Sequence, residues 1–251
     1  MISILLLGYG NVGQHLHRAM QGVTGVTVQQ IYNRSFVENI ETPQTQKLSD
    51  ITEADVYIIA VPDDVIGDFS AKLPFRNKLV VHTSGGAHME VLSNANRRGV
   101  FYPLQTFSKN TEVDFSTIPI CVEAENKDDL KLLKKLGSNI SKNVTEISSE
   151  EREQLHVAAV FINNFTNHLY HIAETISAKN KIEFDLLKPL IAETAKKIET
   201  LSPSQAQTGP AKRNDTKTIE KHLKLLEGSA YRELYEKLTE SIKKSESFDT
   251  T

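Results

Sequence analysis

Short apolar runs alternate with amphipathic stretches through the first part of the chain. The apolar runs have the length of β-strands, and they occupy residues 2–7, 26–32, 56–61, 79–82, 99–101, 118–123 and 144–147. Segments of helical length separate several of these runs, at residues 11–21, 88–97 and 127–136. Strands that alternate with helices favour a parallel sheet with helices on both faces, which is the doubly wound α/β class.

The pattern changes near Ser148, and no strand-like run follows that residue. Ser148 and Glu151 have the spacing of a capping box, which predicts the start of a helix. Four helices are expected beyond it, at residues 150–178, 183–201, 215–226 and 229–244. The sequence therefore predicts a Rossmann-type dinucleotide-binding domain at residues 1–148 and an all-α substrate or dimerisation domain at residues 149–251.

Composition narrows the class of ligand. With a net charge of −3, the chain has no basic excess that would favour binding to a nucleic-acid backbone. Its longest apolar stretches, such as residues 56–62, are too short to span a bilayer. The single cysteine, Cys121, excludes an internal disulfide framework, and its apolar neighbours place it in a core. Since the first residues also lack a signal-peptide pattern, we expect a soluble cytoplasmic protein that binds a small molecule.

A glycine-rich turn follows the first predicted strand. It is a G-x-G-x-x-G motif made of Gly8, Tyr9, Gly10, Asn11, Val12 and Gly13. The motif is common by chance, but here it lies between a strand and an amphipathic helix, which is the context that indicates dinucleotide binding. The first glycine allows the tight turn, the second lets the backbone approach a pyrophosphate, and the third lets the helix pack closely.

The end of the second strand indicates which dinucleotide is bound. A cofactor without a 2′-phosphate usually meets Asp or Glu there, and this chain has neither at Asn33, Arg34 and Ser35. A guanidinium flanked by two small polar side chains suits a dianionic phosphate, because charge-assisted hydrogen bonds are strong. The sequence therefore predicts NADP as the cofactor.

Two further strand ends should lie along the cofactor, because ligands bind at the carboxyl ends of strands in such sheets. Val61 and Pro62 end one of these strands, and Thr83 and Ser84 end the next. Asp63 or Asp64 is expected to cap a helix. A hydrolase with Ser84 as nucleophile is disfavoured, since the G-x-S-x-G elbow is absent.

The predicted helix at residues 150–178 is apolar on nearly every side, so we expect it to be largely buried. It also carries a polar stripe, which needs partners from another helix, a second subunit or a substrate; the stripe consists of His156, Asn163, Asn167 and His171. A metal pair of His168 and His171 lacks a third ligand nearby, so no metal is predicted.

A second polar cluster lies between two predicted helices, at residues 208–215. Lys212 and Arg213 could face an anionic substrate or the cofactor phosphates. The cluster could equally be a helix joint with Asp215 as the N-cap residue.

Several segments resemble known families. The glycine turn, residues 33–35 and residues 60–62 resemble pyrroline-carboxylate reductases and deazaflavin-dependent NADP reductases. A closer similarity is to a group of candidate NADP oxidoreductases with a Rossmann-like domain and a C-terminal domain of unknown function. Four segments carry it, at residues 82–85, 102–107, 156–164 and 209–215. The resemblance implies a helical domain like that of 6-phosphogluconate dehydrogenase relatives, and it implies no particular substrate.

Two positions depart from related families. The related β-hydroxyacid dehydrogenases carry a catalytic lysine before an Asn-Asn pair, where this chain has Val160. His156, one turn earlier, is then the better acid–base candidate. Tyr102 stands where the resemblance would place a histidine before proline.

The sequence favours hydride transfer between NADP(H) and a small carbonyl or imine compound, in a cleft between the two domains. We also expect the protein to be a homodimer. His156 would manage the proton, Asn163 would orient the substrate, and Lys212 or Arg213 would hold an anionic group. A non-catalytic NADP-binding redox sensor is the alternative.

Overall fold

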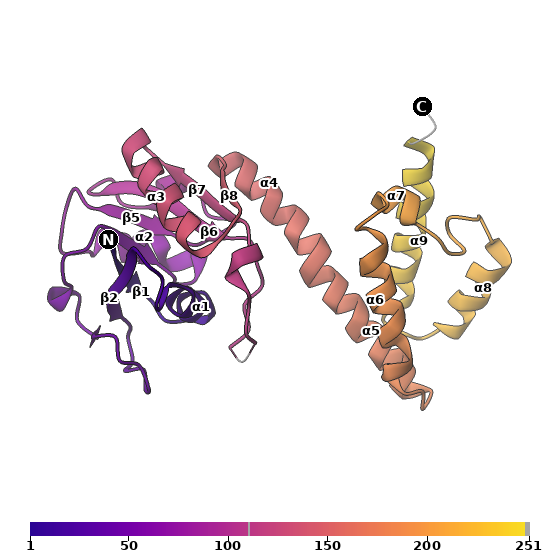
Figure 1. The fold of residues 1–251 in the computed structure, drawn as a ribbon. Coiled ribbons are helices and arrows are strands. Elements are labelled where there is room, and N and C mark those ends of the chain that lie inside the picture. The colour runs from indigo at the N-terminus through magenta and orange to yellow at the C-terminus, as the bar shows by residue number, and fades with distance from the viewer. Residues whose placement is uncertain (110, 249–251) are drawn as a thin grey trace. The chain divides into compact units, whose positions relative to one another are not determined.

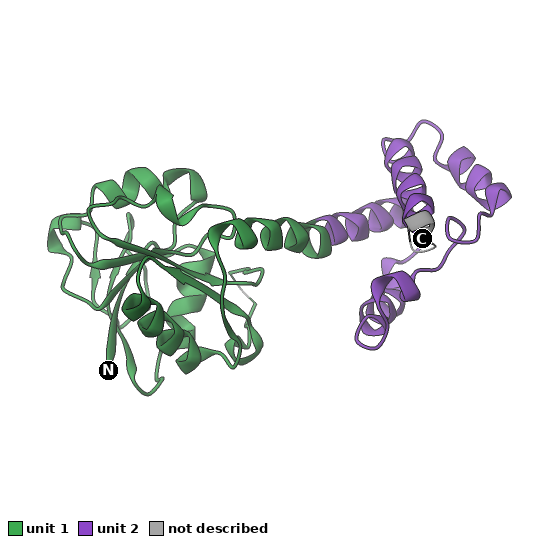
Figure 2. Ribbon diagram, turned by 90° about the horizontal axis from the view of Figure 1, so that it is seen from above, with its two compact units in different colours: residues 1–164 green, residues 165–251 purple. Residues whose placement is uncertain are grey.

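The computed structural model describes residues 1–109 and 111–248, which form two compact units, Met1–Asn164 and Phe165–Thr251 (Figures 1 and 2). We describe each unit by itself. The predicted domain boundary after Ser148 coincides with the start of a helix, whereas the units divide after Asn164, so that boundary stays a prediction.

Unit 1 contains an eight-stranded sheet in the order β3-β2-β1-β4-β5-β6-β7-β8. Its first six strands have the order of a Rossmann fold, with the crossover at β1, so the predicted doubly wound class is confirmed. The strands are β1 (Ile2–Leu7), β2 (Val26–Tyr32), β3 (Gln44–Thr45), β4 (Val56–Ile59), β5 (Leu79–His82), β6 (Arg97–Pro103), β7 (Ile120–Ala124) and β8 (Val144–Glu146).

One strand pair departs from the predicted parallel sheet, because β6 and β7 are antiparallel. A parallel neighbour needs a crossover connection, usually a helix. Between Pro103 and Ile120, the described residues contain only one 3₁₀ turn, Phe115–Thr117. The chain therefore returns beside β6 in the opposite direction.

Helices and turns cover both faces of the sheet. One face packs against α1 (Asn11–Met20) and α3 (Lys127–Ile140) through Leu16, Met20, Leu133 and Leu136. On the other face lie α2 (Ile66–Ala71) and a 3₁₀ turn, Met89–Val91, and Leu92 packs there. Cys121 is buried beside Tyr102, as its apolar neighbours predicted.

Two local predictions in unit 1 are wrong. Residues 88–97 form no α-helix, because Asn96 uses its side chain on the backbone of Lys78 and Phe75 and thereby competes with helical hydrogen bonding. Neither Asp63 nor Asp64 caps a helix. The 3₁₀ turn Asp63–Val65 has Pro62 as its N-cap residue and no side-chain cap.

The helix predicted at residues 150–178 is interrupted. It consists of α4 (Ser149–Ala159), a π-helical turn (Val160–Phe165) and α5 (Thr166–Lys179). The predicted capping box of Ser148 and Glu151 is present. The expected burial is wrong for the single chain, since Phe161 is 62% exposed and Ile162 is 78% exposed.

Unit 2 is helical throughout its described elements. Besides α5 it contains a 3₁₀ turn (Phe184–Leu187), α6 (Lys188–Lys197), α7 (Pro203–Ala206), α8 (Thr216–Leu225) and α9 (Arg232–Phe248). Asp215 caps α8 by accepting the backbone N–H of Thr218, as predicted. Among the described residues, no helix has the length and apolar character needed to cross a membrane.

Candidate active site

The glycine turn joins β1 to α1 at the centre of the sheet. Gly8 has a φ of +108°, and a Cβ atom there would lie 2.4 Å from the carbonyl oxygen of Ala60. A Cβ atom on Gly13 would lie 2.3 Å from the carbonyl oxygen of Gly8. Glycine is therefore required at both positions, because only it allows α1 to pack this closely on the ends of β1 and β4.

Gly10 has a different environment. A Cβ atom on this residue would meet no protein atom within 4 Å. Gly10 is also the N-cap residue of α1, and no side chain caps that helix. An open backbone at a helix start with N–H groups left for a ligand fits the pyrophosphate of a dinucleotide.

Asn33 connects the end of β2 to the glycine turn. Its side-chain oxygen accepts the N–H of Tyr9 at 3.3 Å, and its amide nitrogen donates to the carbonyl of Ser35 at 2.9 Å. Asn33 therefore shapes the turn, while Arg34 and Ser35 are exposed beyond it. This end of β2 offers a cation and no acid, which fits a phosphorylated ribose.

The loop after β5 is organised by buried polar side chains. The Ser84 hydroxyl accepts the backbone N–H groups of Gly86 at 3.1 Å and Ala87 at 2.9 Å. Thr83 donates its N–H to Ile59 of β4. Because the hydrogen bonds of the Ser84 hydroxyl shape this loop and no histidine base is bonded to it, the geometry gives no support to a Ser84 hydrolase.

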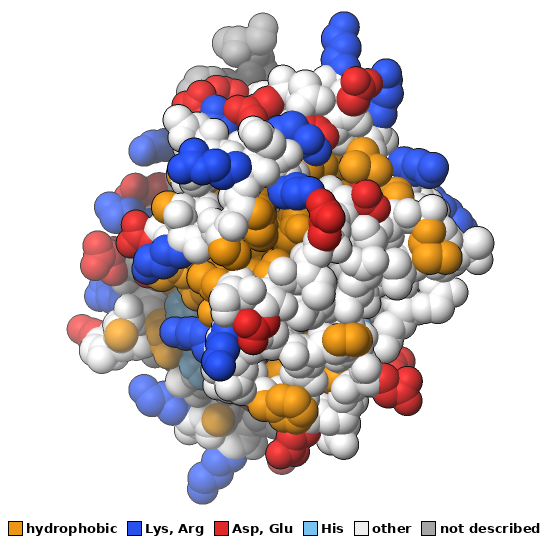
Figure 3. Space-filling model, turned by 90° about the vertical axis from the view of Figure 1, so that its left-hand side faces the viewer, with side chains coloured by type: hydrophobic (Ala, Val, Ile, Leu, Met, Phe, Trp, Pro, Cys, Tyr) orange, Lys and Arg blue, Asp and Glu red, His pale blue; other side chains and the backbone are white. Residues whose placement is uncertain are grey.

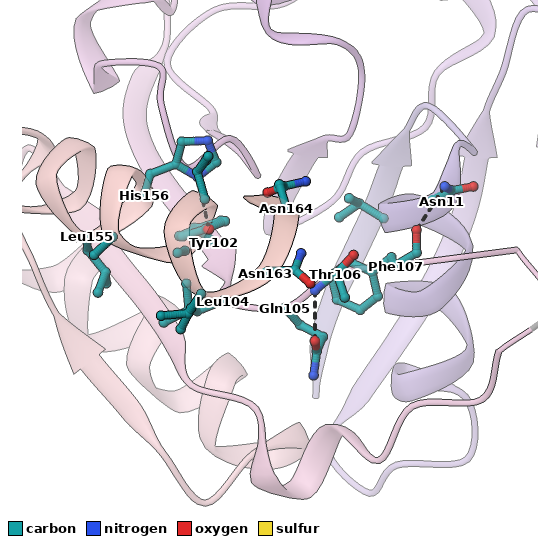
Figure 4. A pocket seen from close by; sticks show the side chains of 15 residues that line it. Asn11, Tyr102, Leu104, Gln105, Thr106, Phe107, Leu155, His156, Asn163 and Asn164 are labelled. Carbon is teal, nitrogen blue, oxygen red and sulfur yellow. Dashed lines mark hydrogen bonds between the residues drawn. The ribbon is translucent and has the colours of Figure 1, made fainter. Parts of the chain in front are cut away.

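His156 of α4 lies directly over this loop. A Cβ atom on Gly85 would lie 2.5 Å from the His156 Nδ1 atom and 2.7 Å from the Tyr102 ring, so the missing side chain at Gly85 makes room for both. The Tyr102 hydroxyl is 3.4 Å from His156 Nδ1 (Figure 4). Burial raises the pKa of Tyr102 to about 12, and the nearby Cys121 adds to the shift. The phenol is therefore protonated at neutral pH.

A buried ion pair anchors the start of α4. The side chain of Arg152 is fully buried, and its Nη1 atom donates to Glu123 of β7 at 2.7 Å. Its Nη2 atom donates to the carbonyl of Ala87 and to the Ser149 hydroxyl. Ser149 also donates both its N–H and its hydroxyl to Glu123. Since Arg152 is one turn before His156, these bonds hold the histidine over the loop after β5.

A cavity of about 550 Å³ lies beside His156 within unit 1 (Figure 4). It extends from the first turn of α1 to α4 and the π-helical turn. Its volume is typical of small-molecule sites. The residues around it are Asn11, Val12, Tyr102, Leu104, Gln105, Thr106, Phe107, Leu155, His156, Ala158, Ala159, Val160, Ile162, Asn163 and Asn164. A π-helical turn at its wall is a feature frequently found at functional sites.

The cavity brings together four of the site residues predicted from the sequence. Asn11 and Val12 come from the glycine turn, and His156 and Asn163 come from the predicted catalytic set. Val61 packs on Gly8, and Pro62 is exposed after β4. Lys212 belongs to unit 2, so its role stays a prediction.

The predicted polar stripe is divided by the π-helical turn. His156 and Asn163 line the cavity, whereas Asn167 and His171 follow in α5. A π-helical turn takes more residues than an α-helical one, so the helical spacing of the stripe does not continue across it. His171 is exposed and lies 3.5 Å from Glu174. Among the described residues, no group of three or more His, Cys, Asp or Glu side chains could hold a metal ion.

Sequence reasoning assigned no role to much of the cavity wall and missed the anchor. The segment Tyr102–Phe107 was singled out only by its resemblance, although it supplies five lining residues. Arg152 and Glu123 left no local signal, because their pairing joins a helix to a strand 29 residues away.

Known proteins show which family this is. A domain family of unknown function, DUF2520, matches residues 118–242. A protein of Bacteroides fragilis described as a candidate NADP oxidoreductase is 38% identical over 97% of this chain and 98% of its own, with a TM-score of 0.88. The chain belongs to the same family of candidate NADP oxidoreductases, as its sequence motifs indicated. No curated protein matches it.

More distant structures share the fold. A Thermotoga maritima protein is 20% identical, with a TM-score of 0.76 over 99% of this chain and 100% of its own. The pyrroline carboxylate reductase of Plasmodium falciparum, solved with NADP bound, is 15% identical, with a TM-score of 0.60 over 97% of this chain and 96% of its own. The name of the Bacteroides fragilis protein agrees with the predicted cofactor, NADP.

Proposed function

We propose that this protein is an NADP(H)-dependent oxidoreductase that acts on a small carbonyl or imine compound. One observation carries the proposal: the start of α1, where a dinucleotide fits, and His156 line the same cavity. The names of the family member from Bacteroides fragilis and of the pyrroline carboxylate reductase support the reaction class.

The cofactor would be held by the residues whose geometry fits it. Gly8 and Gly13 shape the turn, and the open backbone from Gly10 to Val12 would receive the pyrophosphate. Arg34 and Ser35 would bind the 2′-phosphate. When bound, NADPH supplies a hydride to the carbon of a carbonyl or imine bond.

His156 is the acid–base candidate for the accompanying proton. Reduction adds the hydride to carbon and a proton to the oxygen or nitrogen, which gives an alcohol or an amine and NADP⁺. His156 would donate that proton, and the protonated Tyr102 hydroxyl is positioned to hydrogen-bond to its Nδ1 atom. Asn163, on the same wall, would orient the substrate.

Calorimetric titration tests the cofactor assignment. NADPH should bind more tightly than NADH, and Arg34→Ala should weaken NADPH binding by about tenfold or more, because a charge-assisted bond is lost. Arg18→Ala, which removes another cation near the glycine turn, is the matched control and should change little. Equal affinities for the two cofactors, or an unaffected Arg34→Ala variant, would contradict the assignment.

Turnover separates the enzyme from the non-catalytic redox sensor. With a panel of carbonyl and imine compounds, the wild type should oxidise NADPH, and His156→Ala should lower the rate by roughly 10²–10⁴-fold while NADPH affinity stays nearly intact. His168→Ala alters an exposed histidine of unit 2 and serves as the control. Tight NADPH binding without any turnover, together with a protein partner, would favour the sensor.

A further inference from the structure

The wall of the cavity carries no fixed charge, and His156 and Tyr102 are its titratable side chains. Among its fifteen lining residues, all of them described, there is no Lys, Arg, Asp or Glu. Eight of them have apolar side chains, and the polar remainder consists largely of the amides Asn11, Gln105, Asn163 and Asn164. Amides donate and accept hydrogen bonds without carrying a net charge.

The charged groups that act on Tyr102 do not supply a free cation. Tyr102 is neutral at ordinary pH, and the charged groups that influence it include Arg152 and Asp63. Arg152 is buried and its guanidinium is bonded to Glu123 and to the Ala87 carbonyl. Asp63 is an exposed carboxylate near Gly86, and its sign repels an anion.

An anionic substrate would therefore be poorly matched to this cavity. A buried carboxylate or phosphate is costly unless it is paired with a cation, and His156, the one candidate on this wall, gives up its proton in the proposed reduction.

We propose that the substrate is a small, largely apolar carbonyl or imine compound without a carboxylate or phosphate group, recognised through the amides of Gln105, Asn163 and Asn164. The inference rests on the proposed oxidoreductase function and narrows its substrate class. It departs from the sequence-based prediction that Lys212 or Arg213 holds an anionic group.

A neutral ester and the carboxylate from which it derives test the inference. Ethyl levulinate and levulinate carry the same ketone, one as a neutral ester and the other as an anion. Their binding to the full chain is measured by saturation-transfer NMR, with saturating NADP⁺ and also without cofactor, and NADPH oxidation is recorded in parallel. The ester should bind at least about tenfold more tightly than the acid.

Two variants sharpen the result. Val160→Lys adds a cation to the wall and should shift the preference toward levulinate, whereas Lys212→Met should leave the wild-type preference unchanged. Circular dichroism verifies that each variant is folded. If Val160→Lys does not fold, the comparison of ester and acid binding to the wild type decides the question. Leu104→Lys is a second variant of the same kind.

The outcomes are distinct. Equal or tighter binding of levulinate would overturn the inference, and loss of that binding in Lys212→Met would assign the anion site to unit 2. Binding of neither probe would also overturn it, because the cavity would not be a substrate site. Failure of NADPH and NADP⁺ to bind would instead contradict the proposed function, while the probes without cofactor would still report the preference of the cavity.

Discussion

The buried pair of Arg152 and Glu123 allows a quantitative test of how the site is built. The side chain of Arg152 is 0% exposed and that of Glu123 is 17% exposed. Arg152→Met keeps the apolar part of the side chain and removes the guanidinium. Glu123 would then remain as a largely buried carboxylate without its cation, and the carbonyl of Ala87 would lose a donor.

The expected loss follows from that geometry. Removing one partner of a buried ion pair costs about 3–5 kcal/mol, because the remaining charge is uncompensated. Glu123 keeps two other donors, the N–H of Ser149 at 3.1 Å and its hydroxyl at 2.7 Å. We therefore expect a decrease of about 3 kcal/mol in the free energy of unfolding, at the lower end of the range for such pairs.

Urea denaturation followed by circular dichroism measures the change, and hydrogen exchange of the β6 and β7 amides localises it to unit 1. Lys131→Met is the matched control. This variant breaks the ion pair with Asp128. The side chain of Lys131 is 76% exposed and that of Asp128 is 92% exposed, so the free energy of unfolding should stay nearly unchanged.

The double variant Arg152→Met/Glu123→Met decides between charge and packing. It removes both charges, so it should be more stable than Arg152→Met alone. A decrease below about 1 kcal/mol for Arg152→Met would show that the pair is not buried in solution as described. A double variant less stable than the single one would show that packing, and not the uncompensated charge, accounts for the loss.

Three further predictions concern other parts of the molecule. Gly10→Ala should keep the melting temperature of the wild type and lose NADPH affinity, whereas Gly13→Ala should lower the melting temperature as well, because its Cβ atom would overlap the carbonyl of Gly8. Thermal melting and calorimetry would refute this if the two variants behaved alike. Burial, together with the charge of Arg152, lowers the pKa of His82 to about 3. The unfolded chain takes up the proton near pH 6.5, so stability should fall as the pH drops from 6.5 toward 3, by about 2 kcal/mol at pH 5, and His82→Gln should flatten that dependence in urea titrations. The exposed apolar side chains at Phe161 and Ile162 motivate a homodimer, which light scattering would contradict by showing a monomer at every accessible concentration.

The charge pattern on the surface adds little to this picture of ligand class. Acidic and basic side chains are interspersed over the face seen in Figure 3, with hydrophobic side chains between them. This face therefore offers no field of a single sign that would attract a polyanion.

Local signals in the sequence predicted what is local in the structure. The strands Ile2–Leu7 and Leu79–His82 have the predicted bounds, because runs of mostly apolar residues mark strands buried on both faces. Val26–Tyr32 also has its predicted bounds, although Gln29 within it is exposed. The capping box at Ser148 and the glycine turn are also local patterns, since each involves residues a few positions apart. The direction of β7 could not be predicted this way, because it depends on the absence of a crossover helix.

The candidate site was predictable only in part for the same reason. His156 and Asn163 stand out as polar residues on an apolar helix, and the sequence marks them. The contacts that give His156 its surroundings join distant positions, since Tyr102 is 54 residues away and the Arg152 pair spans 29. No periodicity relates such residues, and only the packing of α4 on β6 and β7 brings them together.

The surroundings of His156 are in turn a consequence of two features that each serve the fold. The hydrogen bonds of Ser84 fix the conformation of the loop after β5, and the absence of a side chain at Gly85 leaves room for the imidazole of His156 to pack against that loop. The buried ion pair fixes the first turns of α4 on β7 and on the same loop. Because both features act through Ala87 or its neighbours, a change at either should be felt by His156. Substitutions of Arg152 that leave the chain folded should therefore change the NMR chemical shifts of the His156 imidazole, whereas the equally folded Lys131→Met control should not.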